Sequence, residues 1–200
     1  MDIDPDEAVD EMYRLLTSLI VPRPIGWVST RSTDGVDNLA PFSFYMGVIE
    51  ADPPVVMFSA EHRSDGTLKD SARNAVETEA FGLNLVTADL VEQMDGTSRP
   101  VDPETDEFDV VGLDRREATT IDVPLVAAAK ATMECSLHDT MEVGDHTVVF
   151  GRIERIHVDD ELLTDGKIDI EKVDAVGRLS GSYYARLEPF TVERDWVYKD

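Results

Sequence analysis

The sequence contains a single cysteine, only five lysines and no long apolar run. One cysteine excludes an intramolecular disulfide framework and fits a reducing compartment. A membrane-spanning helix needs roughly 18 consecutive apolar residues, and no stretch of the chain provides them. The acidic N-terminal segment lacks the basic region and apolar core of a secretory signal. These absences predict a soluble cytoplasmic protein with no membrane partner.

Basic residues are scarce altogether, because 18 Lys and Arg stand against 42 Asp and Glu and give a net charge of −24. Such a charge repels nucleic acid phosphates and anionic lipids, so neither is expected as a partner. The acids are dispersed along a chain that is 42% apolar, which favours an ordered core over disorder. The composition predicts a halophilic-type acidic surface, whose self-repulsion is screened over about 3 Å in about 1 M salt.

We therefore expect the melting temperature to rise with salt concentration and the protein to unfold or dissociate at low salt, because screening weakens repulsion among like charges. Thermal unfolding followed by circular dichroism between about 0.1 M and about 1 M KCl tests this. Sucrose is the uncharged control. A melting temperature that does not respond to salt would contradict the prediction.

The length favours one domain over residues 1–200. A helix is predicted within residues 1–21, with Asp4 as N-cap and an apolar stripe at helical spacing. Residues 98–124 are acidic and irregular, which indicates a loop excursion over the body of the protein. This loop is either a lid near a substrate or an ordinary solvated insertion.

Three strands are predicted within residues 22–60, at residues 25–30, 38–48 and 55–60. The middle strand contains Pro41, which cannot donate a ladder hydrogen bond and therefore suits the edge of a sheet. Small hydroxyl residues and aromatics are mixed in these strands in place of a steady supply of Val, Ile and Leu. This mixture favours a surface that faces a flat ligand.

A short helix predicted over residues 69–76 begins beside Arg63, Lys69 and Ser71. The first turn of a helix offers free N–H groups and the positive end of its dipole to an anion. The segment is neither a P-loop nor a dinucleotide fingerprint, since GxxxxGK[ST] and GxGxxG are both missing. A phosphate site and a solvated helix start with a chance ion pair both remain open on this pattern.

The rest of the chain is interpreted mainly as scaffold. Strands are predicted at residues 81–86, 125–138 and 146–158, with the last two antiparallel, and a helix at residues 88–97. Cys135 falls on the apolar face of its strand and is expected in the core. The histidines lack zinc-site spacing, so no metal is predicted. Trp196 and Tyr198 are expected to pack on the body or on a partner subunit.

Four segments follow one another along the chain: PRPIGWVSTRSTDGVDNLAPFSFYMGVIEADPPVVMFSA, KDSARN, FGLNLV and RLSGSYYARL. In this order they resemble the flavin reductase-like family of FMN-binding split barrels, which includes the flavoredoxins. The resemblance covers most of the chain. It implies a mainly β fold, an antiparallel split β-barrel with a few peripheral helices, and a homodimer with FMN at its interface.

The resemblance also implies the residues that bind the cofactor, while no side chain is predicted as an obligatory acid or base. The first flavin-contacting strand is matched by Trp27, Ser29 and Thr30, and the strand that reads the ring edge by Asn38, Ala40, Pro41, Phe42 and Ser43. The phosphate and ribityl side is matched by Ser59, Arg63, Lys69, Asp70 and Ser71, and the closing element by Arg178. From the residues alone, Arg178 completes the phosphate site, binds an anionic substrate or forms a structural ion pair.

The implied function is an oxidoreductase that passes electrons or hydride from NADH, NADPH or another donor through bound flavin to a small-molecule or protein acceptor. Two alternatives keep the same motifs. One is an electron-transfer flavoprotein of flavoredoxin type, and the other is a noncatalytic FMN-binding module.

Overall fold

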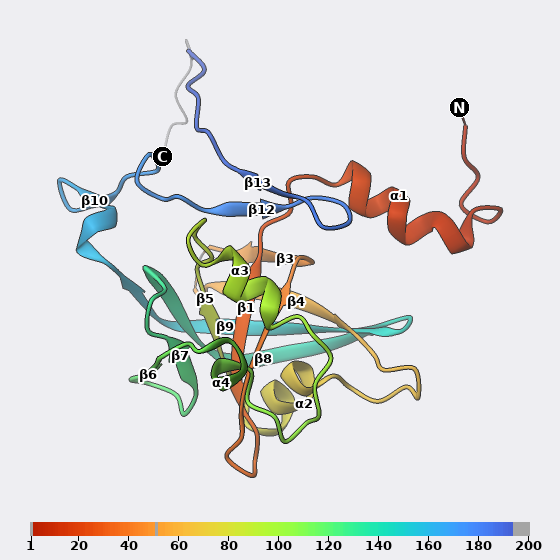
Figure 1. Ribbon diagram of the computed structural model, residues 1–200, viewed down its shortest axis with the longest axis horizontal. Coiled ribbons are helices and arrows are strands. Elements are labelled where there is room, and N and C mark those ends of the chain that lie inside the picture. The colour runs from red at the N-terminus through yellow and green to blue at the C-terminus, as the bar shows by residue number, and fades with distance from the viewer. Residues whose placement is uncertain (1, 51, 194–200) are drawn as a thin grey trace.

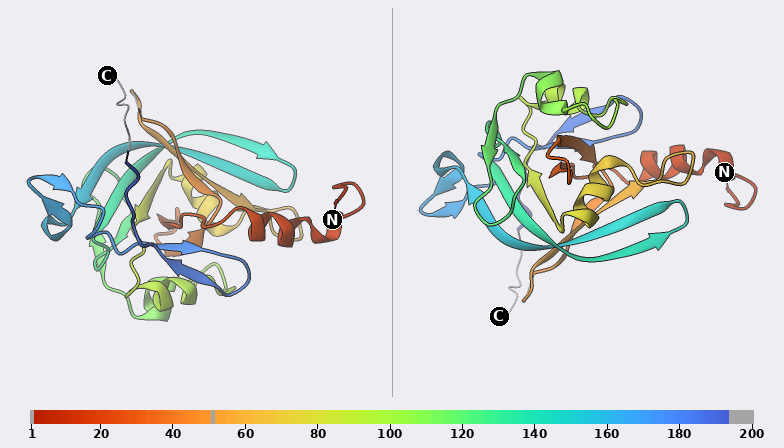
Figure 2. Two further views of the ribbon diagram at one scale, coloured as in Figure 1. Left: turned by 90° about the horizontal axis from the view of Figure 1, so that it is seen from above. Right: turned by 90° about the horizontal axis from the view of Figure 1, so that it is seen from below.

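The computed structural model describes residues 2–50 and 52–193, so the predicted packing of Trp196 and Tyr198 lies outside the described residues. A curled antiparallel sheet of seven strands forms the body of the molecule, with strand order β2-β1-β5-β8-β9-β4-β3. The views from above and below show this sheet curling round without closing on itself (Figure 2). The seven strands are β1 (Gly26–Arg31), β2 (Asp37–Phe42), β3 (Tyr45–Ile49), β4 (Val55–Glu61), β5 (Ala80–Asn84), β8 (Ala131–Val143) and β9 (His146–Val158).

The strand predicted at residues 38–48 is in fact two strands, β2 and β3, at opposite edges of the sheet. The chain turns at Ser43 and Phe44, where the Phe44 carbonyl accepts a hydrogen bond from the Ser59 N–H (2.8 Å). The alternation of side chains alone does not reveal such a crossing, because both halves continue the same pattern. Pro41 lies on the edge strand β2, as predicted.

β8 and β9 form the longest hairpin, and their pairing shifts by a residue between Glu134 and Cys135. A β-bulge of this kind disturbs the strict alternation of faces. Both residues are fully buried as a result, with Cys135 in the core as predicted and Glu134 under the segment before β7 (Pro124–Val126). Burial raises the pKa of the Cys135 thiol, so it stays a packing residue.

The core consists of two apolar clusters. One surrounds Phe58 and Phe81 inside the sheet, and the other joins Trp27 to Met94 and Phe108. β9 passes so close to the first cluster that a Cβ on Gly151 would lie 2.2 Å from Cζ of Phe81. Only glycine therefore leaves room for the ring.

Helix α1 (Met12–Leu19) begins later than the sequence pattern indicates, because Asp4 closes a turn onto Ala8 and a 3-10 turn (Val9–Glu11) follows. The helix projects from the body in Figure 1. Among the described residues, no helix is both long and apolar enough to cross a membrane. The other helices and small hairpins are α2 (Asp70–Glu77), α3 (Val91–Gly96), α4 (Glu107–Val111), the 3-10 turn Asp160–Leu162, β6 (Arg115–Glu117) with β7, β10 (Leu163–Thr164) with β11 (Lys167–Ile168), and β12 (Val176–Arg178) with β13 (Tyr184–Arg186).

Candidate functional site

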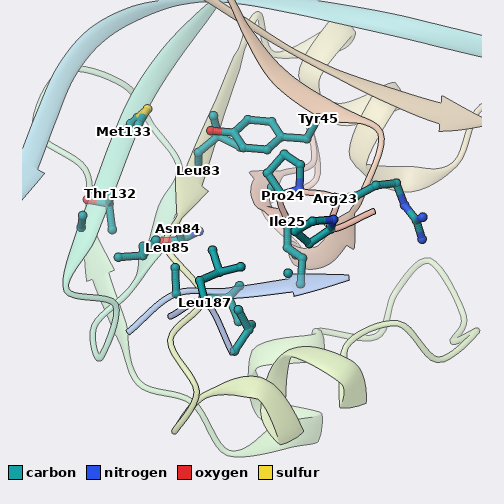
Figure 3. A pocket seen from close by; sticks show the side chains of 17 residues that line it. Arg23, Pro24, Ile25, Tyr45, Leu83, Asn84, Leu85, Thr132, Met133 and Leu187 are labelled. Atoms are coloured by element: carbon teal, nitrogen blue, oxygen red, sulfur yellow. The ribbon is translucent and has the colours of Figure 1, made fainter. Parts of the chain in front are cut away.

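Three cavities border β1 or β2, and predicted site residues line two of them. The first, of about 310 Å³, is apolar, and Figure 3 shows Tyr45, Ile25, Leu83 and Leu187 around it. Among the described residues that line it, Arg23 is the one charged residue. The Arg23 guanidinium instead donates hydrogen bonds to the carbonyls of residues 17, 20 and 179. This cavity has apolar walls but little with which to orient a polar ligand.

The second cavity, of about 340 Å³, combines apolar and charged walls, and we refer to it as the polar cleft. It lies where the edge strand β2 faces the start of α2 and the segment after α3. Its lining residues are Asn38, Ala40, Pro41, Phe42, Arg63, Lys69, Asp70, Thr97, Ser98, Arg99, Pro100, Val101 and Glu107.

β2 presents its free edge at the polar cleft. In an antiparallel ladder, alternate residues turn their backbone groups away from the neighbouring strand. The N–H of Leu39 leaves the ladder in this way and donates to Oε2 of Glu107 (3.0 Å). Pro41, two residues on, has no N–H. The outward groups left at this edge are therefore carbonyl acceptors.

Three cations gather at the other wall of the cleft: Arg63, Lys69 and Arg99. Arg63 is fixed by hydrogen bonds to Oδ2 of Asp70 and the Leu68 carbonyl, both at 2.5 Å. Lys69 is the N-cap of α2 and is exposed, with Nζ 3.3 Å from Oε2 of Glu61. In a chain of net charge −24, this grouping of cations is a feature that favours an anion.

Glu107 brings a buried carboxyl group to the same cleft, with 6% of the residue exposed. Burial is the main cause that raises the pKa of Glu107 to about 7, and the nearby carboxylates of Asp70 and Asp106 add to the rise. The hydrogen bond from the Leu39 N–H opposes this rise but does not cancel it. The group therefore titrates close to neutrality.

We expect the free energy of unfolding to fall by on the order of 2 kcal/mol as pH rises from about 4.5 to about 7, because the folded state holds the Glu107 proton more tightly than the unfolded state. Glu107→Gln should remove this fall. Denaturant titrations at both ends of this pH range test the prediction, with the exposed Glu104→Gln as control. Equal pH dependence in the two variants would contradict it.

The structure brings seven of the predicted site residues together around the polar cleft and places the others elsewhere. Trp27, Ser29, Thr30 and Ser71 are buried beneath it. Three hydrogen bonds hold this layer in place: Trp27 Nε1 to Thr97 Oγ1 (3.0 Å), Asn38 Nδ2 to Ser71 Oγ (2.9 Å) and Asn74 Nδ2 to Thr30 Oγ1 (3.2 Å). Trp27 and Ser71 therefore support residues that line the cleft, whereas Thr30 is bonded to α2 and the Ser29 hydroxyl accepts from Nδ2 of Asn84 (3.1 Å). None of the four is part of the lining.

Ser59 is half-buried on β4 and does not line the polar cleft, whereas Ser43 and Arg178 line a neighbouring cavity. Sequence reasoning missed Thr97, at the end of the predicted helix at 88–97. It also missed Glu107 and residues 98–101, which the structure brings to the cleft from the predicted loop excursion at 98–124. That excursion contains α4 and β6. The sequence DEFDVVG, with Asp106 as N-cap and Gly112 as C-cap, is the signal that could have found α4.

Comparisons with known proteins agree with this architecture. Residues 18–172 match the family described as the flavin reductase like domain. A protein of Aquifex aeolicus is 40% identical over 178 residues, which cover 88% of this chain and 90% of the relative.

Solved structures extend the likeness to the whole fold. Nitrilotriacetate monooxygenase component B from Bacillus cereus superposes with a TM-score of 0.90 at 32% identity, covering 96% of this chain and 98% of that one. The 2-nitrobenzoate 2-nitroreductase of Pseudomonas fluorescens gives 0.87 at 28% identity, covering 99% of both chains. A split-barrel protein of Shewanella frigidimarina shares the fold with a TM-score of 0.83 at 21% identity, covering 97% and 98%. The predicted split barrel is confirmed, and the chain belongs to the flavin reductase-like family.

Proposed function

We propose that the chain binds FMN noncovalently in the polar cleft and passes electrons or hydride from a reduced nicotinamide, or another donor, through the flavin to an acceptor. The observation that carries the proposal is the pairing of a free strand edge with three cations across one cavity. Family membership supports it, as do the flavin reductase-like features that the sequence motifs imply.

The walls of the cleft fit the two ends of this cofactor. The isoalloxazine ring is flat and has a polar edge with an N–H donor, which suits the outward carbonyls of Leu39 and Pro41 in β2. Phe42 supplies apolar cover. The phosphate tail suits Lys69 at the start of α2 together with Arg63 and Arg99, which line the same cleft.

The flavin, when bound, supplies the hydride and electron chemistry. The task of the chain is then to hold the ring and the donor in contact and to keep the site polar at one edge. The buried hydrogen bonds of Asn38 and Trp27 stiffen the wall that performs this positioning. The names of two similar structures, a monooxygenase component and a nitroreductase, are consistent with this division of labour.

We also propose that the protein is a homodimer with the cofactor near its interface. Support comes from α1 and the 3-10 turn before it, where Val9, Tyr13 and Leu19 are 70%, 75% and 77% exposed although they are apolar or aromatic. An apolar face of this kind is typical of an association surface. Tyr13 also lines a cavity that borders the polar cleft.

Leu19→Glu should weaken the dimer by on the order of 10-fold or more, because a charge would be buried in the proposed interface. Light scattering across a dilution series measures the dissociation constant. Ser18→Glu, also exposed on α1, is the control. A wild-type protein that is monomeric at every concentration would overturn the dimer.

The test of the function begins with the absorbance spectrum of the purified protein in high salt, before and after FMN is added. Flavin bands that follow the protein through gel filtration support the proposal. Oxidation of NADH and NADPH with free FMN as acceptor then identifies the donor. A colourless protein that does not retain added FMN would overturn the proposed function.

A further inference from the structure

A third cavity, of about 260 Å³, adjoins the polar cleft, and we refer to it as the arginine cavity. Pro41 and Ser98 line both. Its other walls come from α1, α3, β12 and β13. Its lining contains apolar side chains such as Ile25 and Met94 as well as polar ones.

Arg178 is held in the arginine cavity by its neighbours. Its guanidinium lies 4.5 Å from the centroid of the Tyr184 ring, and Nη2 donates to the Gly181 carbonyl (2.5 Å). Tyr184 is fixed in turn, because its hydroxyl donates to Oδ1 of Asp95 (2.7 Å). Nη1 of Arg178 also lies 3.9 Å from Oδ1 of Asp95, beyond hydrogen-bond distance. The hydrogen bond to Gly181 thus uses one N–H, whereas a guanidinium has five N–H donors. Donors remain for a ligand in a side chain that is already oriented.

The local charge favours an anion. Arg23 and Arg178 both line the cavity, and Asp95 is the acidic residue in its lining, so the described charges sum to +1 within a chain of net charge −24. Arg23 is only 4% exposed, and the carbonyls around it hold it in place. A positive, partly buried site of this kind discriminates strongly between a charged ligand and its neutral analogue.

We propose that the arginine cavity binds the second substrate of the reaction, a small molecule that carries one carboxylate or phosphate group, with Arg178 holding that group. The inference rests on the proposed function, since it places this substrate beside the flavin cleft. The shared walls at Pro41 and Ser98 put the two ligands in adjoining cavities. The proposal also gives Arg178 a role apart from the phosphate end of the polar cleft, where Lys69 and Arg63 lie.

Isothermal calorimetry with benzoate, phenyl phosphate and neutral benzamide tests the proposal at fixed ionic strength, on protein with and without FMN. At least one of the two anions should bind the wild type about 10-fold or more tightly than benzamide. Arg178→Gln should abolish this preference for the anion over benzamide, and Arg178→Lys should keep part of it. Arg186→Gln, in the neighbouring β13 and 71% exposed at its side chain, should leave it unchanged.

The outcomes separate the two proposals. A preference for benzoate identifies a carboxylate substrate, and a preference for phenyl phosphate identifies a phosphate substrate. Equal binding of all three probes by the wild type, or an unchanged ratio in Arg178→Gln, overturns the inference. Failure of the proposed function is seen independently, as failure of the wild type to bind FMN. The FMN affinity of Arg178→Gln should match that of the wild type.

Discussion

Replacing Glu134 by alanine should lower the free energy of unfolding by about 3–5 kcal/mol at neutral pH, because a buried charged network loses its central acceptor. Glu134 is fully buried and accepts hydrogen bonds from the N–H and hydroxyl groups of Thr119 and Thr120. Nε2 of His157 lies 2.6 Å from its Oε1. The carboxylate thus joins the segment before β7 to the β8–β9 hairpin.

Urea unfolding followed by circular dichroism measures this effect. Glu154→Ala is the matched control, because Glu154 also accepts a hydroxyl hydrogen bond, from Ser136 (2.6 Å), but at the surface. The control should change stability by less than about 1 kcal/mol. Equal losses in the two variants would refute the structural role of Glu134.

The same carboxylate also makes the stability of the folded protein fall in acid. Burial by itself would raise the pKa of Glu134, but the hydrogen bonds from Thr120, His157 and Thr119 outweigh burial and lower it to about 2. The stability that Glu134 contributes is therefore present above about pH 4.5 and is lost as pH falls toward 2. The alanine variant should lack this part of the acid dependence.

Replacing both Lys69 and Arg99 by alanine should weaken FMN binding by at least about 100-fold, because each charge-assisted contact to a phosphate contributes roughly 1.5–3 kcal/mol. Both side chains line the polar cleft and both residues are exposed, so their removal leaves the core intact. Flavin fluorescence titration at one fixed salt concentration measures the dissociation constant.

The control for this double variant removes the same amount of charge elsewhere. Lys167 and Arg155 are exposed and do not line the polar cleft. Their double alanine variant should retain FMN as tightly as the wild type, and both double variants should share its melting temperature without FMN. An unchanged FMN affinity in Lys69→Ala/Arg99→Ala would remove these two residues from the site.

The sequence by itself determined the elements that local pattern governs. The helix predicted at 69–76 is α2, and the strand predicted at 146–158 is β9, because apolar periodicity and turn residues report such elements directly. Pro41 on an edge strand followed from its missing N–H. The motif order also indicated the family, which the match over residues 18–172 shows.

Only the tertiary structure decided which of these residues share a cavity. The chain crosses between the two sheet edges at Ser43, and this crossing separates β2 from β3 although the side-chain pattern continues. Folding brings Arg99 and Glu107 to β2 from a distant segment that looked like an acidic loop. It also buries Ser71 beneath the cleft and moves Arg178 into a separate cavity. Contacts between residues far apart in sequence depend on how the sheet curls, and local periodicity carries no information about that curl.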